Sequence, residues 1–238
     1  MTSSSEIILN VTLLVICYAY IFVTIIIAVK MGHRLPKNAR RKFLHIMIGN
    51  FVYIIPFFTF TTFPTNFPFY VALPFIPLTL FASPSSPINL KTKIGGLADI
   101  TSSGHNFGLL LYAISYTVLA LFFSAKPYII TAGILPMAFG DAAASIVGQK
   151  IGRHKFRMIP NKSYEGSAAM FLITLISVTF SLLLYSYLCP FSLLTVVVAS
   201  LGVAIAATVL EAVTPKGLDN LTVPLFSAIL FLILTGGM

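Results

Sequence analysis

The stretch that decides the fold lies near the N-terminus, where residues 7–29 read IILNVTLLVICYAYIFVTIIIAV. It is an unbroken apolar run of the length that an α-helix needs to cross a bilayer, about 20 residues. The run is too long for the core of a signal peptide, and the six residues before it contain no Lys or Arg. We therefore predict that it forms a retained first transmembrane helix.

Seven further apolar runs follow this first one along the chain. They cover residues 43–60, 67–81, 107–124, 127–147, 166–188, 191–213 and 221–234. The third run is short and contains Pro68, Pro74 and Pro77, so we expect it to be kinked or re-entrant. The runs are continuous rather than alternating, which disfavours a transmembrane barrel. We predict an all-α polytopic membrane bundle of about eight spans, with seven as the alternative, in a single domain over residues 1–238.

The composition agrees with a membrane protein and excludes several other classes. Of the 238 residues, 58% are hydrophobic and 9% are charged, whereas soluble domains have about 45–50% and about 25%. A soluble enzyme and a disordered regulator are therefore excluded. Cys17 and Cys189 both lie in or beside apolar runs, so neither a disulfide framework nor a cysteine metal site is implied.

The basic residues indicate how the chain is oriented. All of the 15 Lys and Arg residues except Lys126 lie in alternate loops, at 30–42, 82–106, 148–165 and 214–220. The positive-inside rule then places these loops in the cytoplasm and both termini on the opposite side. This topology also accounts for the net charge of +9 without any binding of nucleic acid.

Acidic residues are scarce, and all but one lie towards the same side of the membrane as the basic loops. The six are Glu6, Asp99, Asp141, Glu165, Glu211 and Asp219. Asp141 lies nine residues before Lys150, which is about 13 Å inside the end of its predicted helix. An ionisable residue at such a depth is a functional candidate. The alternative is a buried aspartate that is bonded to a hydroxyl or to the backbone.

The segment after Asp141 presents small residues on one helix face. Asp141, Ser145, Gly148 and Gly152 are spaced so that they share this face. One interpretation is a close packing seam between two helices. The other is the wall of a ligand cleft, in which Asp141 is a metal ligand.

The segment NKSYEG, residues 161–166, comes just before the sixth apolar run. Ser163, Glu165 and Gly166 could cap the start of a helix. A helix N-terminus beside Lys162 is also an anion site, because the backbone N–H groups and the helix dipole favour phosphate. The nearby cations that could contact phosphate as well are Arg153, Lys155 and Arg157.

A third polar segment, EAVTPKGLDNLTVPL, covers residues 211–225. Its Pro and Gly predict a tight turn, with Lys216 in the turn and Asp219 and Asn220 at the start of the last helix. Asp and Asn oxygens are ligands that Mg²⁺ accepts. Alternatively, one of the two residues caps the helix.

The segment RRKFLH, residues 40–45, opens the second apolar run. His45 lies about one helical turn from Arg41 and Lys42, so the three side chains can face one point. The alternatives are a histidine satisfied within its helix and a basic anchor at the membrane surface. His105 lies in the polar segment SSGHN, residues 102–106, and is grouped with these residues as a candidate on the substrate side. The chain has no P-loop motif, so any nucleotide would bind without one.

Four of these segments, taken in chain order, resemble the dolichol kinase/phytol kinase family of CTP-dependent lipid kinases, which is related to the phosphatidate cytidylyltransferases. They are RKFLH at 41–45, GDAAA at 140–144 with Gly148, Gly152 and Arg153, KSYEG at 162–166, and Glu211 followed by PKGLDNLTVPL at 215–225. The resemblance runs from Arg41 to Leu225. It implies an integral membrane enzyme that transfers the γ-phosphoryl group of CTP to the hydroxyl of a polyprenol, at a site that faces the cytoplasm. It also implies that Asp141, Lys162 and Glu165, together with Asp219, lie at the nucleotide–metal site.

The resulting hypothesis gives each candidate residue a role in phosphoryl transfer. The metal ligands for Mg²⁺ are Asp141, Glu165 and Asp219, and the catalytic carboxylates are Asp141, Glu165 and Glu211, of which Asp141 or Glu211 is the base. The nucleotide-binding residues are Lys162, Arg153, Lys155, Arg157, Gly148, Gly152, Ser163, Lys216 and Asn220. The residues on the substrate side are Arg41, Lys42, His45 and His105.

Two alternative functions remain open from the sequence. A CTP-dependent phosphatidate-type cytidylyltransferase would release pyrophosphate instead of CDP. A secondary transporter also uses polar residues within the membrane, but its acids should cluster near the midplane of the bilayer rather than towards one face. The predicted partners are a lipid alcohol, CTP and membrane lipids.

Overall fold

The computed structural model describes residues 4–83, 107–156, 162–215 and 217–237. The chain divides into two compact units, residues 1–127 and 128–238, and each is described by itself. Within the described residues every regular element is helical, apart from one isolated bridge between Lys155 and Ser163. The prediction of an all-α membrane protein is confirmed, whereas the single domain stays a prediction.

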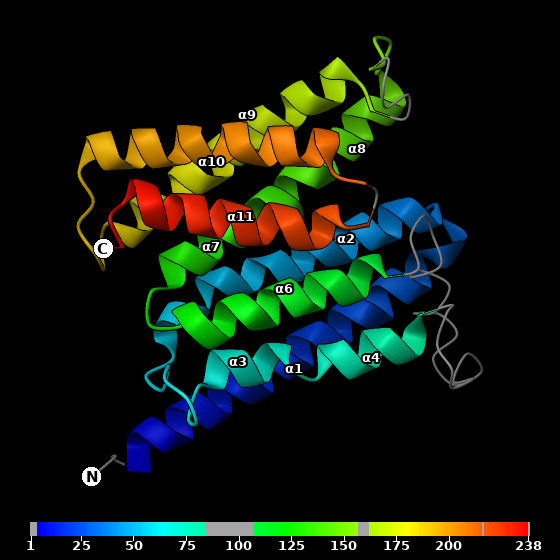
Figure 1. Ribbon diagram of the computed structural model, residues 1–238. Helices are drawn as coiled ribbons and strands as arrows, with labels where there is room; N and C mark the ends of the chain where they lie inside the picture. The colour runs from blue at the N-terminus through cyan, green and yellow to red at the C-terminus, as the bar shows by residue number, and fades with distance from the viewer. Residues whose placement is uncertain (1–3, 84–106, 157–161, 216, 238) are drawn as a thin grey trace. The chain divides into compact units, whose positions relative to one another are not determined.

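The first unit contains one long helix and several shorter ones (Figure 1). Its α-helices are α1 (Ser4–Lys30), α2 (Lys37–Gly49), α3 (Phe67–Ala72), α4 (Phe75–Ala82) and α6 (Gly108–Phe123). Short 3₁₀ turns cover Met31–His33, Asn50–Tyr53 and Ile55–Phe57. Helix α1 packs against α2 and α3, and α6 packs against α3 and α4.

Two of the apolar runs in this unit are broken. The run at 43–60 does not form one continuous helix, because α2 ends at Gly49 and the chain continues in 3₁₀ turns. Pro56 lies in the second of these turns and has no N–H to continue an α-helix. The run at 67–81 is divided into α3 and α4, with Pro74 at the start of α4. The predicted kink in the third run is therefore confirmed.

Two buried asparagines hold the first unit together. The amide of Asn10 in α1 donates to the Thr59 hydroxyl and accepts from the backbone N–H groups of Thr59 and Phe60. Asn66 accepts from the N–H of Phe69 at the start of α3 and donates to the Ala120 carbonyl of α6. Both side chains are fully buried. Each amide thus satisfies backbone groups that an apolar interior would otherwise leave without partners.

The second unit is built from longer helices. Its elements are α7 (Pro127–Leu135), a π-helical turn (Pro136–Gly140), α8 (Asp141–Lys150), α9 (Tyr164–Tyr185), α10 (Leu193–Val213) and α11 (Asp219–Leu234). Helix α9 packs against α8 and α10, and α10 packs against α11. The π-helical turn joins α7 to α8, and it contacts α9, α10 and α11.

Among the described residues, four helices are long and apolar enough to cross a membrane: Ser4–Lys30, Pro127–Lys150, Tyr164–Tyr185 and Leu193–Val213. Shorter apolar helices cover Phe67–Ala82, Gly108–Phe123 and Asp219–Leu234. Large apolar side chains on α9 and α10 are exposed, with Ile176 62% exposed and Leu193 74%. Such a surface fits a hydrocarbon solvent rather than water. The number of spans and the sidedness of the loops stay predictions.

Candidate functional site

A buried ion pair lies at the centre of the candidate site, in the second unit. The ammonium of Lys162 lies 2.5 Å from a carboxylate oxygen of Glu211, and both side chains are about nine-tenths buried, with 10% and 9% exposed. The same ammonium donates to the Glu211 backbone carbonyl in the last turn of α10. A cation is stabilised there by the helix dipole as well as by the carboxylate. Lys162 comes just before α9, so the pair joins the start of α9 to the end of α10.

Two further carboxylates lie around this pair. Asp141 and Asp219 both interact electrostatically with Glu211. Asp141 is 5% exposed at the first position of α8, and Asp219 begins α11. The structure thus brings together Asp141, Lys162, Glu211 and Asp219, which sequence analysis assigned to one site. These four side chains comprise three carboxylates and one ammonium.

The π-helical turn positions Asp141. Its backbone N–H donates to the carbonyl of Pro136, five residues back, so the turn is wider than an α-helical one. A β-carbon at Gly140 would overlap the Thr174 hydroxyl and the Met170 sulfur of α9. Asp141 therefore leaves a tightly packed, irregular turn, and such π-turns are frequent at functional sites. Sequence analysis missed this turn, although Pro136 within an apolar run was a signal for it.

The glycines after Asp141 form a packing seam. The hydroxyl of Ser163 lies among Gly148, Gly152 and Gly166, and a β-carbon on Gly152 would collide with both Ser163 and the Gly148 carbonyl. A β-carbon on Gly166 would lie 3.0 Å from the Ala144 carbonyl of α8. The glycines thus let α8 and α9 approach closely, as the packing interpretation of this face predicted. Their role in binding a nucleotide stays a prediction.

Ser163 and Glu165 have local roles at the start of α9. Ser163 is the N-cap residue, because its hydroxyl accepts from the N–H of Gly166. Glu165 lies 2.7 Å from the Nδ1 atom of His154 and also accepts from the His154 N–H. The segments around 154–156 and 162–164 are joined by backbone hydrogen bonds. Glu165 therefore stabilises the loop between α8 and α9 through His154. No contact in the described part of the chain joins Glu165 to Asp141 or Asp219.

His154 is a residue that sequence analysis missed, and nothing in its local sequence pointed to Glu165 as a partner. Its side chain is 79% exposed. The flanking cations Arg153 and Lys155 are exposed as well. The Lys155 ammonium lies 3.5 Å from the Gly148 carbonyl at the end of α8. These cations face solvent beside the glycine seam, so they are accessible to an anion.

The turn before α11 is organised by Asp219. One oxygen of its carboxylate accepts from the N–H groups of Gly217 and Asn220 and from the Asn220 amide. Gly217 has φ +94°, a conformation that L side chains rarely adopt. Asp219 thus holds the turn with one oxygen. The N-cap residue of α11 is Leu218, without a side-chain cap hydrogen bond, so the interpretation of Asp219 or Asn220 as the helix cap is wrong. The same arrangement does not test the assignment of Asp219 as a metal ligand.

In the first unit, α2 buries a cluster of cations near its start. Arg40, Arg41 and Lys42 are each less than one-tenth exposed, and His45 is 1% exposed. The His45 ring stacks on Tyr112 of α6 with centroids 4.7 Å apart, and the Tyr112 hydroxyl donates to the His45 carbonyl. The basic segment 40–42 and His45 are thus buried on the same helix, and whether their side chains face one point stays a prediction. The assignment of Arg41, Lys42 and His45 to the substrate side stays a prediction.

Three predicted site residues, Arg157, Lys216 and His105, lie outside the described residues. Among the residues that are described, no three His, Cys, Asp or Glu side chains form a group that could hold a metal ion by themselves. Magnesium commonly takes only one or two protein carboxylates together with substrate phosphates. The assignment of Asp141, Glu165 and Asp219 as Mg²⁺ ligands stays a prediction.

Comparisons with known proteins point to one kind of enzyme. The chain is similar to a phytol kinase of Synechocystis sp., with 40% identity over 146 residues, which are 59% of this chain and 60% of that protein. It is similar to a probable chloroplastic phytol kinase of Triticum aestivum, with 30% identity over 94% of this chain and 77% of the wheat protein. A chloroplastic phytol kinase 1 of Arabidopsis thaliana is 29% identical over 80% of this chain and 64% of its own length.

No protein-family model matches the chain, and no solved structure does. The similarity to the wheat protein nevertheless covers almost the whole chain. The chain is an all-α membrane protein that belongs to the phytol/dolichol kinase-type family. The match to the cyanobacterial relative spans 60% of that protein's length.

Proposed function

We propose that this protein is a membrane-bound lipid kinase that transfers the γ-phosphoryl group of CTP to the hydroxyl of an isoprenoid alcohol. The products are an isoprenyl phosphate and CDP. The observation that carries the proposal is the buried Lys162–Glu211 pair with Asp141 and Asp219 around it. Its relatives that are named phytol kinases support the class of acceptor.

Lys162 is proposed to contact the phosphates of the nucleotide. A lysine ammonium has three N–H donors, and two of them go to the carbonyl and carboxylate of Glu211. The third donor is available for a phosphate oxygen, and the pair holds the ammonium at a defined place. The exposed Arg153 and Lys155 are proposed to add charge at the entrance.

Asp141 and Asp219 are proposed to hold Mg²⁺, with Glu165 as the third predicted ligand. Bound there with the triphosphate, Mg²⁺ would neutralise charge that develops on the transferred group. Asp141 is well suited because it is buried and rigidly placed by the π-helical turn. Glu165 is less well suited, because its carboxylate is paired with His154.

In the proposed reaction the oxygen of the alcohol forms a bond to the γ-phosphorus. The bond between the γ-phosphorus and the oxygen that bridges it to the β-phosphate breaks, and CDP leaves. The alcohol also loses its proton. Glu211 or Asp141 is proposed to accept this proton. The Lys162 ammonium lies 2.5 Å from a carboxylate oxygen of Glu211 and would orient this group towards the alcohol. The buried cations of α2, with His45, are proposed to contact the phosphate end of the lipid.

We also propose that these sites face the cytoplasm and that both termini lie on the opposite side of the membrane. The distribution of Lys and Arg among the loops supports this orientation.

A product assay tests the proposed function. The purified chain in detergent is incubated with Mg²⁺, γ-labelled CTP and one of four acceptors: phytol, geranylgeraniol, dolichol or diacylglycerol. We expect the label in an isoprenyl phosphate, and γ-labelled ATP in place of CTP measures nucleotide preference. Label that appears only in pyrophosphate, with phosphatidate added, would make the protein a cytidylyltransferase. Absence of label from every lipid product, for a folded protein, would contradict the proposal.

A further inference from the structure

An aromatic pair lies beside Lys162, in the segments that join α8 to α9. The rings of Phe156 and Tyr164 are in contact, with centroids 4.3 Å apart and planes inclined by 45°. Tyr164 is 58% exposed at the first position of α9, and Phe156 is half-buried. The roles given above to Lys162 and Glu165 involve neither ring. The pair therefore offers an aromatic surface that the proposed mechanism has not used.

The pairing of the two segments places these rings on the same face as Lys162. Lys155 and Ser163 form an antiparallel bridge. Next to it, the N–H of Phe156 donates to the Lys162 carbonyl, and the N–H of Tyr164 donates back to the first segment. Side chains alternate between the two faces of such a pair, and residues opposite each other share a face. Phe156, Lys162 and Tyr164 thus lie on one face, and Lys155 and Ser163 on the other.

The contacts of the second face show which way the pair is turned. The Lys155 ammonium lies 3.5 Å from the Gly148 carbonyl at the end of α8. The Ser163 hydroxyl would lie 3.3 Å from a β-carbon built on Gly148. The face with Lys155 and Ser163 is therefore turned towards α8, and the face with the aromatic rings points away from it.

The rings and the ammonium are spaced like the two ends of a nucleotide. Ser163, between Lys162 and Tyr164, is extended, with φ −133° and ψ 153°. The α-carbons of Lys162 and Tyr164 are therefore about 7 Å apart. A nucleotide has an aromatic base at one end and a polyanion at the other, with a ribose between them. An exposed ring next to a cation suits both ends, because bases stack on aromatic side chains and phosphates pair with ammonium groups.

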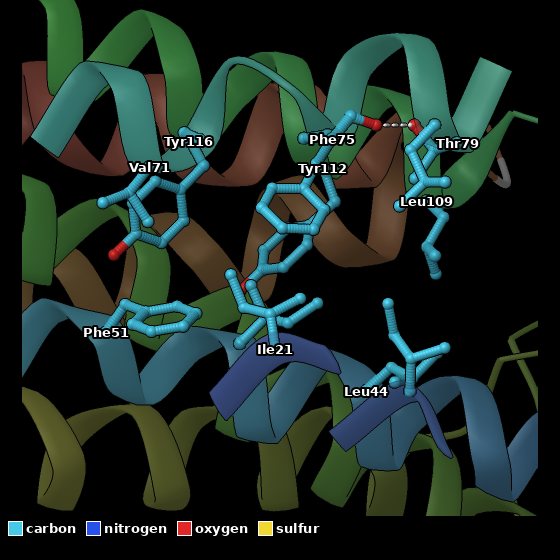
Figure 2. Close-up of a pocket in the computed structure, with 14 residues that line it drawn as sticks. Ile21, Leu44, Phe51, Val71, Phe75, Thr79, Leu109, Tyr112 and Tyr116 are labelled. Atoms are coloured by element: carbon cyan, nitrogen blue, oxygen red, sulfur yellow. Dashed lines mark hydrogen bonds between the residues drawn. The ribbon is translucent and has the colours of Figure 1, made fainter. Parts of the chain in front are cut away.

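A cavity in the first unit is not an alternative site for the base. Figure 2 shows it, with Leu44, Phe51 and Leu109 among the apolar side chains that line it. Its volume is about 40 Å³, whereas small-molecule sites have roughly 300–1,000 Å³. It is too small for a nucleobase or for an isoprenoid tail.

We propose that the base of the nucleotide stacks on Tyr164, which Phe156 supports from behind, while Lys162 contacts the phosphates. This inference rests on the proposed function for the presence of a nucleotide. Because every base has a π face, stacking adds affinity without distinguishing CTP from ATP. A competing role for an exposed tyrosine is an anchor at the membrane surface, where tyrosines are enriched. The experiments below separate the two roles.

The first test uses a fluorescent reporter at the position itself. The chain contains no tryptophan, so Tyr164→Trp places a single indole in the pair. The emission of the whole protein in lipid nanodiscs is followed with Mg²⁺ and without any lipid alcohol. We expect saturable quenching by CTP and by ATP, and none by inorganic tripolyphosphate, which has no base.

Tyr187→Trp is the matched control, because Tyr187 is 90% exposed just beyond the other end of α9. It corrects for light that the nucleotide absorbs and should show no further response. Equal responses of the two variants to CTP, or quenching by tripolyphosphate as strong as by CTP, would overturn the proposal. Quenching of Tyr164→Trp by brominated lipids but not by CTP would make the residue a membrane anchor and would overturn it as well.

The second test removes the π face and keeps an apolar side chain. Tyr164→Leu should raise the Kd for labelled CTP by about tenfold in equilibrium dialysis, with the Kd for tripolyphosphate unchanged. Tyr164→Phe, which retains the ring, should keep the native Kd for CTP. Equal losses for the Leu and Phe variants, or a loss shared by tripolyphosphate, would overturn the proposal.

These tests separate the inference from the proposed function, because neither depends on catalysis. If CTP quenches Tyr164→Trp as expected but no lipid phosphate forms, the stacking site stands and the kinase proposal fails. If lipid phosphate forms from CTP but the indole does not respond, the kinase proposal stands and the stacking site fails.

Discussion

The first unit buries neutral amides, and the second buries a cluster of charges. Asn10 and Asn66 each form hydrogen bonds to backbone groups, so their polar atoms have partners within the protein. The side chains of Lys162 and Glu211 are about nine-tenths buried. Two more carboxylates, Asp141 and Asp219, interact electrostatically with Glu211. A satisfied amide stabilises the fold, whereas a buried charge costs free energy unless it is paired.

The cations at the start of α2 are the exception in the first unit. Arg40, Arg41 and Lys42 are each less than one-tenth exposed. The comparison therefore separates neutral groups that hold helices in place from charged groups that are candidates for binding or catalysis. The predictions below test that distinction, from the largest expected effect to the smallest.

Removing one partner of the buried ion pair should have the largest effect. Lys162→Met leaves the Glu211 carboxylate buried without its cation, so we expect a loss of stability on the order of 3–5 kcal/mol. The double variant Lys162→Met/Glu211→Gln should regain most of it and remain inactive. Unfolding in denaturant and the product assay measure the two quantities. A single variant as stable as the double one would contradict a buried pair.

Asp141→Asn should impair turnover and spare the fold. The change keeps the shape of the side chain and removes one charge from a cluster of like charges, so we expect native stability. Because the carboxylate is needed for metal binding or proton transfer, turnover should fall by about 10²–10⁴-fold. Ser145→Ala, one turn further along α8, is the control. Normal turnover of Asp141→Asn would remove Asp141 from the proposed mechanism.

Asn10→Ala should destabilise the first unit. The substitution leaves the N–H groups of Thr59 and Phe60 without their acceptor, at a cost of about 1–3 kcal/mol. We expect a lower midpoint of unfolding with unchanged KM values for CTP and phytol at a temperature where the variant is folded. An altered KM with native stability would assign Asn10 to a binding site instead.

His154→Ala should have the smallest effect, because its pair with Glu165 is exposed to solvent. We expect an unchanged midpoint of unfolding and turnover within a factor of about two of the native protein. If turnover collapses, the pair belongs to the catalytic site, as the resemblance implies for Glu165.

Much of the site was predictable because its members lie in short polar segments at helix ends. The segments around Asp141, Lys162 and Asp219 stand out in a chain with few charges. The partners were less predictable. Lys162 and Glu211 are far apart in the chain, and sequence gives no distance between them. Glu165 was grouped with the metal ligands, but the structure pairs it with His154.

The sequence by itself determined the class of fold and the location of the polar segments. Long apolar runs permit only helices in a membrane, because every backbone group must find a partner within its own segment. Tertiary structure alone decided which ends of those helices meet, that a π-helical turn precedes Asp141, and that α2 forms one wall of an apolar cavity. These features depend on packing between segments distant in the chain, and local residue patterns carry no record of such distances.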